Sequence, residues 1–269
     1  VSVTPILTGE DVVLRLLDQS LILSGLGELG LAPDAMALFE EPIVRPNGIF
    51  LVTRPTGSGK TTTLYAALAA INCPEVKIVT LEDPVEYLLE GVNQVQVHTA
   101  VDLTFAKALR AMLRQAPNVV MLGEIRDYET ASIAINASLT GHLVFSTLHT
   151  NDAPSAVTRL MDIGVKPFLI ASATRCLMAQ RLVRKICPKC EAPTEPDKSE
   201  LLALGLDPDN IKDPNFLAGK GCDKCNGTGH KGRFGLFEVF VVDDESRKMI
   251  VNKVTTTDLR RRAREVGMR

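Results

Sequence analysis

The chain has no tryptophan, and phenylalanine and tyrosine together make up only 4% of its 269 residues. Proteins that hold single-stranded nucleic acid stack its bases on aromatic side chains and attract its backbone with positive charge. The formal net charge here is −2, so the chain also lacks an overall attraction to nucleic acid or anionic membranes. We therefore expect no nucleic-acid partner, and any contact with a polyanion would have to be local.

Long apolar runs are also missing. No segment approaches the roughly 20 apolar residues of a membrane-spanning helix. The first residues lack the basic and then apolar pattern of a secretory signal sequence, which predicts a cytosolic location. The chain begins at Val1 without an initiator methionine and stops at Arg269 after a basic stretch, so we expect a fragment of a longer protein. Its apolar content of 45% is ample for a globular core.

The most informative segment present is RPTGSGKTT at residues 54–62, between the apolar run GIFLVT and the helical stretch LYAALAA. A strand that enters a glycine-rich turn followed by a helix is typical of a phosphate-binding loop. In this interpretation Lys60 reaches the β- and γ-phosphates and the Thr61 hydroxyl binds Mg²⁺. The candidate nucleotide-binding residues are Pro55, Thr56, Gly57, Ser58, Gly59, Lys60, Thr61 and Thr62.

One position departs from the motif G-x-x-x-x-G-K-[ST], because Arg54 stands where the first glycine is expected. A side chain there would crowd the turn, since only glycine tolerates positive φ freely, and we expect weaker nucleotide binding. The alternative interpretation of the whole segment is a glycine-rich surface turn before a helix.

Short β-rich runs alternate with helical stretches from Gly48 to about Arg184, which predicts an α/β fold with a parallel sheet. Before it, Gly9 and Glu10 mark a turn between two short strands. We divide the chain into four parts. They are the end of an N-terminal domain and a linker (1–46), a phosphate-loop core (47–184), a four-cysteine subdomain (185–240) and a C-terminal helical segment (241–269).

Acidic and imidazole side chains follow several of the predicted strands. Glu124 ends the run NVVMLGE, where a carboxylate can orient an attacking water, or be simply solvated. In TLEDPVEY, Glu82 and Asp83 are candidates for a metal and water network, with a surface turn as the alternative. His142 and His149 bracket the run LVFSTL as candidate γ-phosphate contacts, or are partly buried structural histidines.

Two C-x₂-C pairs, Cys187 with Cys190 and Cys222 with Cys225, are typical of a structural site that holds one Zn²⁺ with four thiolates. Two disulfides are the alternative, which a cytosolic setting disfavours. Cys73 and Cys176 lie outside the pairs, and we expect both to be buried thiols.

These segments, in this order, resemble the secretion ATPase superfamily, and most closely the assembly ATPases of type II secretion and type IV pili, the general secretory pathway protein E group. The resemblance rests on GIFLVTRPTGSGKTTTLYAAL, TLEDPVEY, VVMLGEIRDYETASIAINASLTGHLVFSTLHTNDA and the two cysteine pairs. It implies a RecA-like core, with Glu124 as the catalytic carboxylate. It also implies that Arg15, in VVLRLLD, belongs to the last strand of a preceding domain that supplies arginines to the nucleotide.

The resemblance further implies a hexameric ATPase that uses ATP, Mg²⁺ and Zn²⁺. Such a motor would act at the cytoplasmic face of the inner membrane, through a membrane platform protein and other proteins of a secretion or pilus machine. Two alternatives stay open. One is a DNA-uptake or conjugation motor of the same fold, and the other is a nucleotide-binding subunit that does not hydrolyse ATP, which Arg54 motivates.

Overall fold

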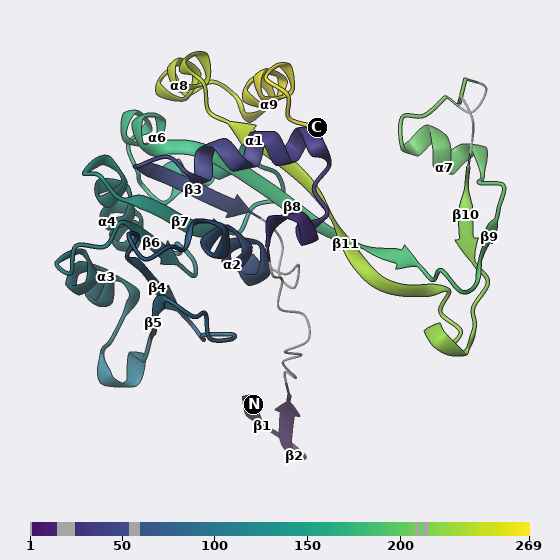
Figure 1. Ribbon diagram of the computed structural model, residues 1–269, viewed down its shortest axis with the longest axis horizontal. Coiled ribbons are helices and arrows are strands. Elements are labelled where there is room, and N and C mark those ends of the chain that lie inside the picture. The colour runs from purple at the N-terminus through teal and green to yellow at the C-terminus, as the bar shows by residue number, and fades with distance from the viewer. Residues whose placement is uncertain (1, 15–24, 54–59, 208–209, 212–214) are drawn as a thin grey trace. The chain divides into compact units, whose positions relative to one another are not determined.

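The structure is a computed structural model that describes residues 2–14, 25–53, 60–207, 210–211 and 215–269 (Figure 1). The chain divides into two compact units. The first comprises residues 1–180 and 237–269, and the second comprises residues 181–236. Each unit is described separately below.

A seven-stranded sheet forms the centre of the first unit, in the order β11-β8-β3-β7-β6-β4-β5. From β8 through β3, β7, β6 and β4 to β5, neighbouring strands run parallel. The strands are β3 (Gly48–Thr53), β4 (Ile78–Glu82), β5 (Val92–Gln96), β6 (Val119–Leu122), β7 (Leu143–Leu148), β8 (Thr174–Ile186) and β11 (His230–Val241). The predicted α/β fold with a mostly parallel sheet is therefore confirmed.

Helices cover both faces of this sheet, which explains why β3, β4, β6 and β7 are buried along their whole length. Side chains of β3 alternate between two cores. Ile49 and Leu51 pack with α3–α6, α8 and α9, whereas Phe50 and Val52 pack with α1 and α2. The helices are α1 (Pro33–Ile43), α2 (Lys60–Ile71), α3 (Phe105–Leu113), α4 (Tyr128–Leu139), α5 (Ser155–Asp162), α6 (Pro167–Ala173), α8 (Asp244–Val251) and α9 (Thr256–Glu265), with 3₁₀ turns η2 (Leu26–Leu29) and η3 (Thr99–Val101).

Short polar side chains fix where several of these helices begin. Asp127 precedes α4 and accepts a 2.8 Å hydrogen bond from the Thr130 N–H, and Thr104 does the same for α3 through the Lys107 N–H. Such caps satisfy backbone donors that the first turn leaves without a partner. The cap at Asp127 lies three residues after Glu124, and α4 starts at the next residue, Tyr128.

An N-terminal hairpin pairs β1 (Ser2–Ile6) with β2 (Gly9–Val13) in antiparallel register. The sequence correctly indicated two short strands here but misplaced the turn. Leu7 and Thr8 form the turn, and Gly9 is the first residue of β2, opposite Ile6, with a φ of 140° that favours glycine.

The second unit is small and contains the cysteine pairs. Its elements are β9 (Glu191–Pro193), α7 (Lys198–Ala203), β10 (Leu217–Gly219) and the 3₁₀ turn η4 (Asp223–Cys225), with β9 and β10 antiparallel. The four-part division predicted from the sequence stays a prediction. Over the described residues of the whole chain, no helix combines the length and apolar character needed to cross a bilayer.

Candidate functional site

The candidate site lies where the parallel strands β3, β4, β6 and β7 end. In register, Leu81 of β4 lies beside Leu122 of β6, which lies beside Ser146 of β7. The segments that follow these strands therefore emerge at one edge of the sheet, where ligands of such folds bind. Glu82 is the last residue of β4, and Asp83, Glu124 and His149 lie in the segments that follow β4, β6 and β7.

Strand β3 ends at Thr53, directly before the segment that the sequence predicts to bind phosphate. Arg54 and the candidates Pro55 through Gly59 lie outside the described residues, and so does Arg15. Helix α2 begins at Lys60, directly after the segment, as the motif requires. Thr62, in the first turn of α2, is half-buried.

Glu124 is the best-positioned carboxylate of the site. One of its oxygens accepts a 2.5 Å hydrogen bond from Arg126 Nη2, and the other lies 3.2 Å from His149 Nε2. Its side chain is only 14% exposed, whereas Arg126 is 67% exposed. Burial raises the pKa of Glu124, but the hydrogen bonds and charges of Arg126, and then those of His149, outweigh it and hold the pKa below its ordinary value. The group is therefore an ionised hydrogen-bond acceptor at neutral pH.

Backbone contacts hold the turn that carries Glu124. The Gly123 N–H donates to the Leu81 carbonyl at 2.7 Å, and the Gly123 carbonyl accepts from the Thr147 hydroxyl at 2.7 Å. A Cβ at position 123 would lie 3.3 Å from the Leu81 carbonyl oxygen, closer than such contacts normally come. The absence of a side chain at Gly123 thus lets the turn sit between β4 and β7 and fixes the position of Glu124.

Glu82 has a different environment from Glu124. It is the last residue of β4, is 3% exposed, and accepts hydrogen bonds from the Tyr65 hydroxyl, from Thr80 Oγ1 at 2.5 Å and from Gln94 Nε2 at 3.1 Å. Burial, and then the hydrogen bond to Glu82, raise the pKa of Tyr65. Burial and the Glu82 charge raise the pKa of Tyr87 to about 12. Protein donors therefore occupy both oxygens of Glu82.

Asp83 is exposed, next to Glu82. The pKa of Arg126 is raised, first by its hydrogen bond to Glu124 and more weakly by the charge of Asp83. Arg126 thus links the two carboxylates electrostatically. The role of Arg126 was not predicted from the sequence, although its position two residues after Glu124 was a usable signal.

The two histidines lie at opposite ends of β7. His149 follows the strand and contacts Glu124, whereas His142 precedes it and lies 3.0 Å through Nδ1 from the carbonyl oxygen of Ala137 in α4. Six strand residues separate them, which corresponds to roughly 20 Å. The structure thus brings together Glu124 and His149 but does not bring His142 to this edge.

The loop after His149 is tied to the C-terminal elements. Asp152 accepts hydrogen bonds from the Ser155 backbone and hydroxyl and from Arg260 of α9 at 2.8 Å. The carboxylate of Glu238 in β11 accepts from the Ala153 N–H at 2.9 Å. Burial raises the pKa of Asp152, but the hydrogen bonds from Ser155 and Arg260 outweigh it, so the pKa is lowered.

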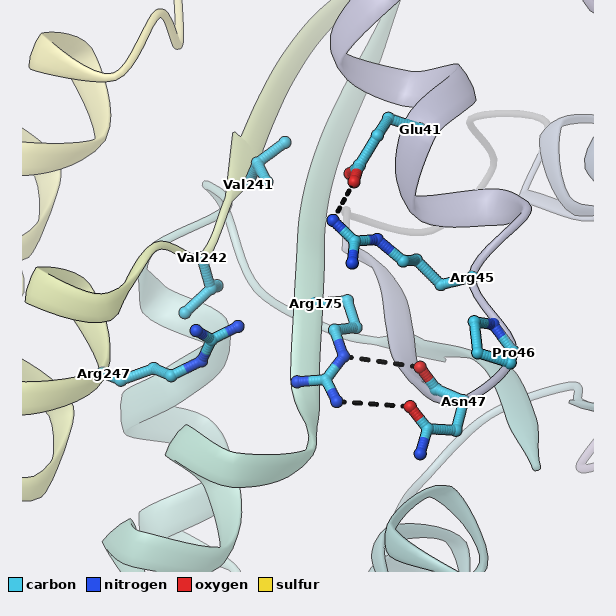
Figure 2. A pocket seen from close by; sticks show the side chains of 8 residues that line it. All are labelled: Glu41, Arg45, Pro46, Asn47, Arg175, Val241, Val242 and Arg247. Carbon is cyan, nitrogen blue, oxygen red and sulfur yellow. Dashed lines mark hydrogen bonds and ion pairs between the residues drawn. The ribbon is translucent and has the colours of Figure 1, made fainter. Parts of the chain in front are cut away.

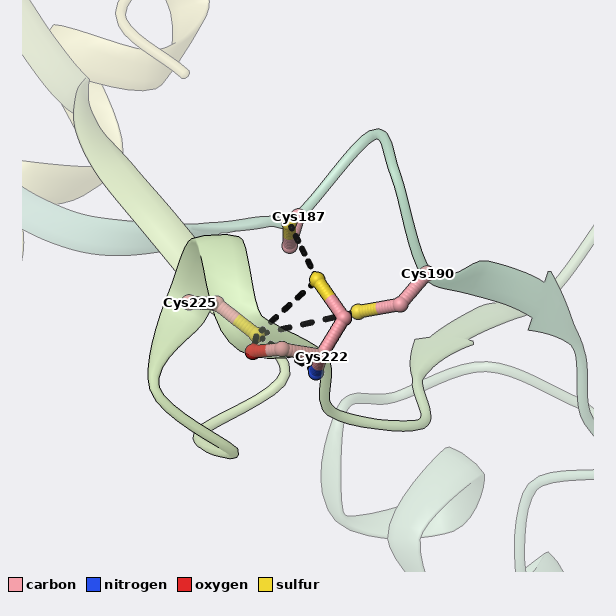
Figure 3. A group of neighbouring side chains, drawn as sticks. All are labelled: Cys187, Cys190, Cys222 and Cys225. Atoms are coloured by element: carbon pink, nitrogen blue, oxygen red, sulfur yellow. Dashed lines mark hydrogen bonds between the residues drawn. The ribbon is translucent and has the colours of Figure 1, made fainter.

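The four paired cysteines form one cluster in the second unit (Figure 3). All their sulfur atoms lie within 4.8 Å of one another, with 3.9 Å between Cys187 and Cys222, 3.8 Å between Cys190 and Cys225, and 3.7 Å between Cys222 and Cys225. Four thiolates around a tetrahedral Zn²⁺ at about 2.3 Å would be separated by about 3.8 Å. The donor set and its spacing therefore fit zinc.

Backbone N–H groups also point at this cluster. Cys225 Sγ accepts from the Cys222 N–H at 3.1 Å and the Gly229 N–H at 3.3 Å. Burial raises the pKa of Cys225, and these hydrogen bonds outweigh it and lower the pKa to about 6. Gly229 can approach because it faces Gly219: a Cβ on Gly219 would lie 1.9 Å from the Gly229 carbonyl oxygen.

All six cysteines are free thiols in the structure. Cys176 is buried, as expected, and burial raises its pKa. The expectation for Cys73 was wrong, because this residue lies just after α2 and is exposed.

Comparison with known proteins agrees with this architecture. The sequence matches the type II/IV secretion system protein family over residues 1–269. It is 51% identical over 267 residues to type II secretion system protein E of Pseudomonas aeruginosa, covering 99% of this chain and 53% of that protein. It is 47% identical over 269 residues to the type IV pilus assembly ATPase PilB of Myxococcus xanthus, covering 100% of this chain and 48% of that protein. The chain thus spans about half the length of these curated relatives.

Solved structures show the same fold. The pilus retraction motor PilT, determined with bound ADP, superimposes with a TM-score of 0.63 at 28% identity, covering 95% of this chain and 66% of that one. The ATPase DotB of Legionella pneumophila gives a TM-score of 0.62 at 24% identity, covering 90% of this chain and 57% of that one, which supports the fold alone. The resemblance identified from the motifs is confirmed, and this chain belongs to the type II/IV secretion system protein family.

Proposed function

We propose that this chain is the ATP-binding and ATP-hydrolysing part of a motor that powers type II secretion or type IV pilus assembly. The observation that carries the proposal is the ionised Glu124 carboxylate, held by Arg126 and His149 at the sheet edge where the segment 54–59 follows β3. The motifs, the family match and the relatives named for these two systems support it.

In this proposal, the backbone N–H groups of the loop before α2 and the Lys60 side chain hold the phosphates, and Thr61 holds Mg²⁺. Bound Mg²⁺ supplies positive charge that neutralises the phosphate oxygens. Glu124 accepts a hydrogen bond from the attacking water and orients it or takes its proton. His149 and Arg126 keep Glu124 ionised and fix its rotamer, and Asp83 supports the charge of Arg126.

Glu82 takes an indirect role in this scheme. Its network with Tyr65, Thr80 and Gln94 connects the first turns of α2 to the end of β4. We therefore propose that Glu82 is a positioning residue, which fixes α2 against the end of β4. His142 and Arg15 stay candidates from the family resemblance, His142 for coupling to a neighbouring element and Arg15 for charge stabilisation.

The wider assembly is proposed on the same basis. The chain would form a homo-hexamer with a RecA-like core and the four-cysteine unit as a zinc subdomain. Residues 1–46 would be the end of a preceding domain and a linker. The motor would act on the cytoplasmic side of the inner membrane through platform proteins. Work of this kind requires that ATP and ADP differ in their affinity for two conformations.

The test is steady-state hydrolysis of ATP by the full-length protein with Mg²⁺. In Glu124→Gln we expect turnover to fall by at least about 100-fold while nucleotide binding is retained, because the amide cannot accept the proton of water. Glu129→Gln is the matched control, since Glu129 forms an exposed pair with Arg110 on the surface. Undiminished turnover in Glu124→Gln would remove Glu124 from this role. ATP binding without phosphate release by the wild type would favour a non-hydrolysing subunit.

A further inference from the structure

A cavity of about 390 Å³ lies where the parallel strands begin, opposite the ends that carry Glu124 and His149 (Figure 2). It lies where β3 and β8 begin and where β11 leads into α8. Its lining combines three guanidinium groups with one carboxylate and an apolar wall. The lining residues are Glu41, Arg45, Pro46, Asn47, Arg175, Val241, Val242 and Arg247.

Arg175, the second residue of β8, is the fixed centre of this cavity. Its guanidinium donates to the Asn47 carbonyl at 3.4 Å, to Asn47 Oδ1 at 3.3 Å and to the Ser172 carbonyl at 3.1 Å. These contacts use three of its five N–H donors. Among the described residues, no carboxylate pairs with it. Arg175 thus brings an uncompensated positive charge with free donors into the cavity.

Gly48 makes this position of Arg175 possible. A Cβ at residue 48 would lie 2.3 Å from Arg175 Cγ and 2.9 Å from its Nε, and the Gly48 φ is 124°. Any side chain there would push the arginine away from Asn47. The start of β3 is therefore shaped to accommodate this guanidinium.

Arg45 and Arg247 approach from the two sides, from the end of α1 and from α8. Each pairs with an acidic neighbour on its own helix or turn, Arg45 with Glu41 and Arg247 with Asp244 at 2.5 Å. Glu41 is 51% exposed and Asp244 is 92% exposed. Exposed pairs of this kind are weak, so both arginines can turn to a stronger anionic partner.

The three cations also repel one another. Burial, and then the charges of Arg247 and Arg45, lower the pKa of Arg175. Composition does not explain such a cluster, because acidic residues outnumber basic ones in the chain, 32 to 30. An anion in the cavity would relieve the repulsion and satisfy the remaining donors.

We propose that this cavity binds the phosphate group of a small anion. Guanidinium groups bind phosphate oxygens through paired, charge-assisted hydrogen bonds. Because three guanidinium groups converge here, the cavity favours a phosphate group over a single carboxylate. The volume is within the range of small-ligand sites, and Val241 and Val242 offer an apolar surface to the group that carries the phosphate. This site is separate from the nucleotide segment, which follows the other end of β3.

The test measures inorganic phosphate binding to the full-length protein by isothermal titration calorimetry, with excess ADP and Mg²⁺ present to occupy the proposed nucleotide site. A Lys60→Ala variant repeats the titration with that site disabled. We expect binding in both cases and at least a tenfold loss of affinity in Arg175→Gln, because the fixed charge and its donors are removed. Arg247→Gln lies at the rim, where a change does not disturb the strand, and it should also weaken binding.

Arg261→Gln is the matched control, because Arg261 forms an exposed pair with Asp258 away from the cavity. It should bind phosphate like the wild type.

A second experiment measures binding to vesicles of phosphatidylglycerol. Vesicle binding that is weaker in Arg175→Gln would identify the ligand as a lipid phosphate. Binding to inorganic phosphate but not to the vesicles would identify a free anion. No phosphate binding in the presence of ADP, or wild-type affinity in both Arg175→Gln and Arg247→Gln, would overturn the proposal. This experiment does not measure ATP hydrolysis. A negative result would therefore refute the phosphate site without refuting the motor proposal.

Discussion

Thr63 in the first turns of α2 donates a 2.6 Å hydrogen bond to Gln180 of β8, across 117 residues of sequence. Both side chains are buried, Thr63 completely and Gln180 to 5% exposure. The bond attaches α2 to the strand that leads into the four-cysteine unit, since Gln180 is the last residue of the first unit before Arg181.

Replacing Thr63 with valine should destabilise the fold. Valine keeps the shape but leaves the Gln180 carbonyl oxygen buried without this donor, at a cost of about 1–3 kcal/mol. Urea unfolding measures the loss, and Thr63→Ser, which keeps the hydroxyl, is the control. Adding Gln180→Met to Thr63→Val should recover part of the stability, because both polar groups are then gone. Equal stability of Thr63→Val and Thr63→Ser would show that the hydrogen bond contributes nothing.

The pH dependence of ATP hydrolysis should report on His149. The contacts of Arg126 and His149 lower the pKa of Glu124, so removing either one raises it. Glu124 would then be protonated at higher pH, and the acidic limb of the kcat profile should move to higher pH in His149→Ala and further in Arg126→Gln. The comparison is made between about pH 5 and 8. His142→Ala serves as the control, because His142 lies at the other end of β7 and should leave the acidic limb in place. An unchanged limb in His149→Ala would separate this histidine from Glu124.

Zinc should be bound by the four-cysteine cluster. We expect one zinc ion per chain by mass spectrometry of the purified protein, because the sulfur spacing fits a closed tetrahedral site. Removing the metal with a chelator, or replacing Cys222 with serine, should increase protease cleavage within residues 181–236, since such sites stabilise small units that lack a large core. Cys73→Ser changes an exposed thiol outside the cluster and should retain the metal. Protein that lacks zinc and is as protease-resistant as Cys73→Ser would contradict a structural metal.

Acid should weaken the contact between the C-terminal helices α8 and α9, which Asp243 and Arg262 hold together. Burial raises the pKa of Asp243, but the hydrogen bonds from Arg262 and Ser246 outweigh it, and the pKa falls to about 2. A depressed pKa stabilises the fold above the unfolded value of about 3.9, and the contribution is lost as the pH falls toward 2. Asp243 also caps α8 by accepting from the Ser246 N–H at 2.9 Å.

Asp243→Asn keeps the cap but loses the charge, and should cost up to about 1 kcal/mol at neutral pH. Asp243→Ala loses both and should cost about 1–2 kcal/mol. Thermal unfolding at pH 7 and near pH 2 tests the sign: the difference between the wild type and Asp243→Asn should shrink in acid. A difference that grows in acid would contradict the ion pair with Arg262.

Much of the fold was predictable because parallel strands buried on both faces are continuous apolar runs. GIFLVT, the run that ends at Glu82, the run before Glu124 and LVFSTL all became central strands. The four-cysteine cluster could also be predicted, since the spacing of the two C-x₂-C pairs indicates that they meet at one site. The catalytic and nucleotide-binding roles assigned from the motifs stay predictions.

The hydrogen-bond partners of the site residues could not be predicted, because they depend on contacts between residues that are distant in the sequence. Nothing near Glu82 indicates that Tyr65 and Gln94 would bond both its oxygens. By contrast, the sequence already showed that His142 and His149 lie at opposite ends of β7, because they bracket LVFSTL. It did not show that His142 would contact the Ala137 carbonyl of α4. Cys73 was misjudged because its exposure depends on the end of α2.

The second unit leaves the sheet from β8 and returns through β11, and these two strands are neighbours. Its 181–236 segment is therefore an insertion between adjacent strands rather than a link between distant parts of the sheet. A short connection from Gln180 to Phe237 would preserve the order of every other strand. A change in the length of the four-cysteine insert therefore need not alter the strand order at the edge that carries Glu124.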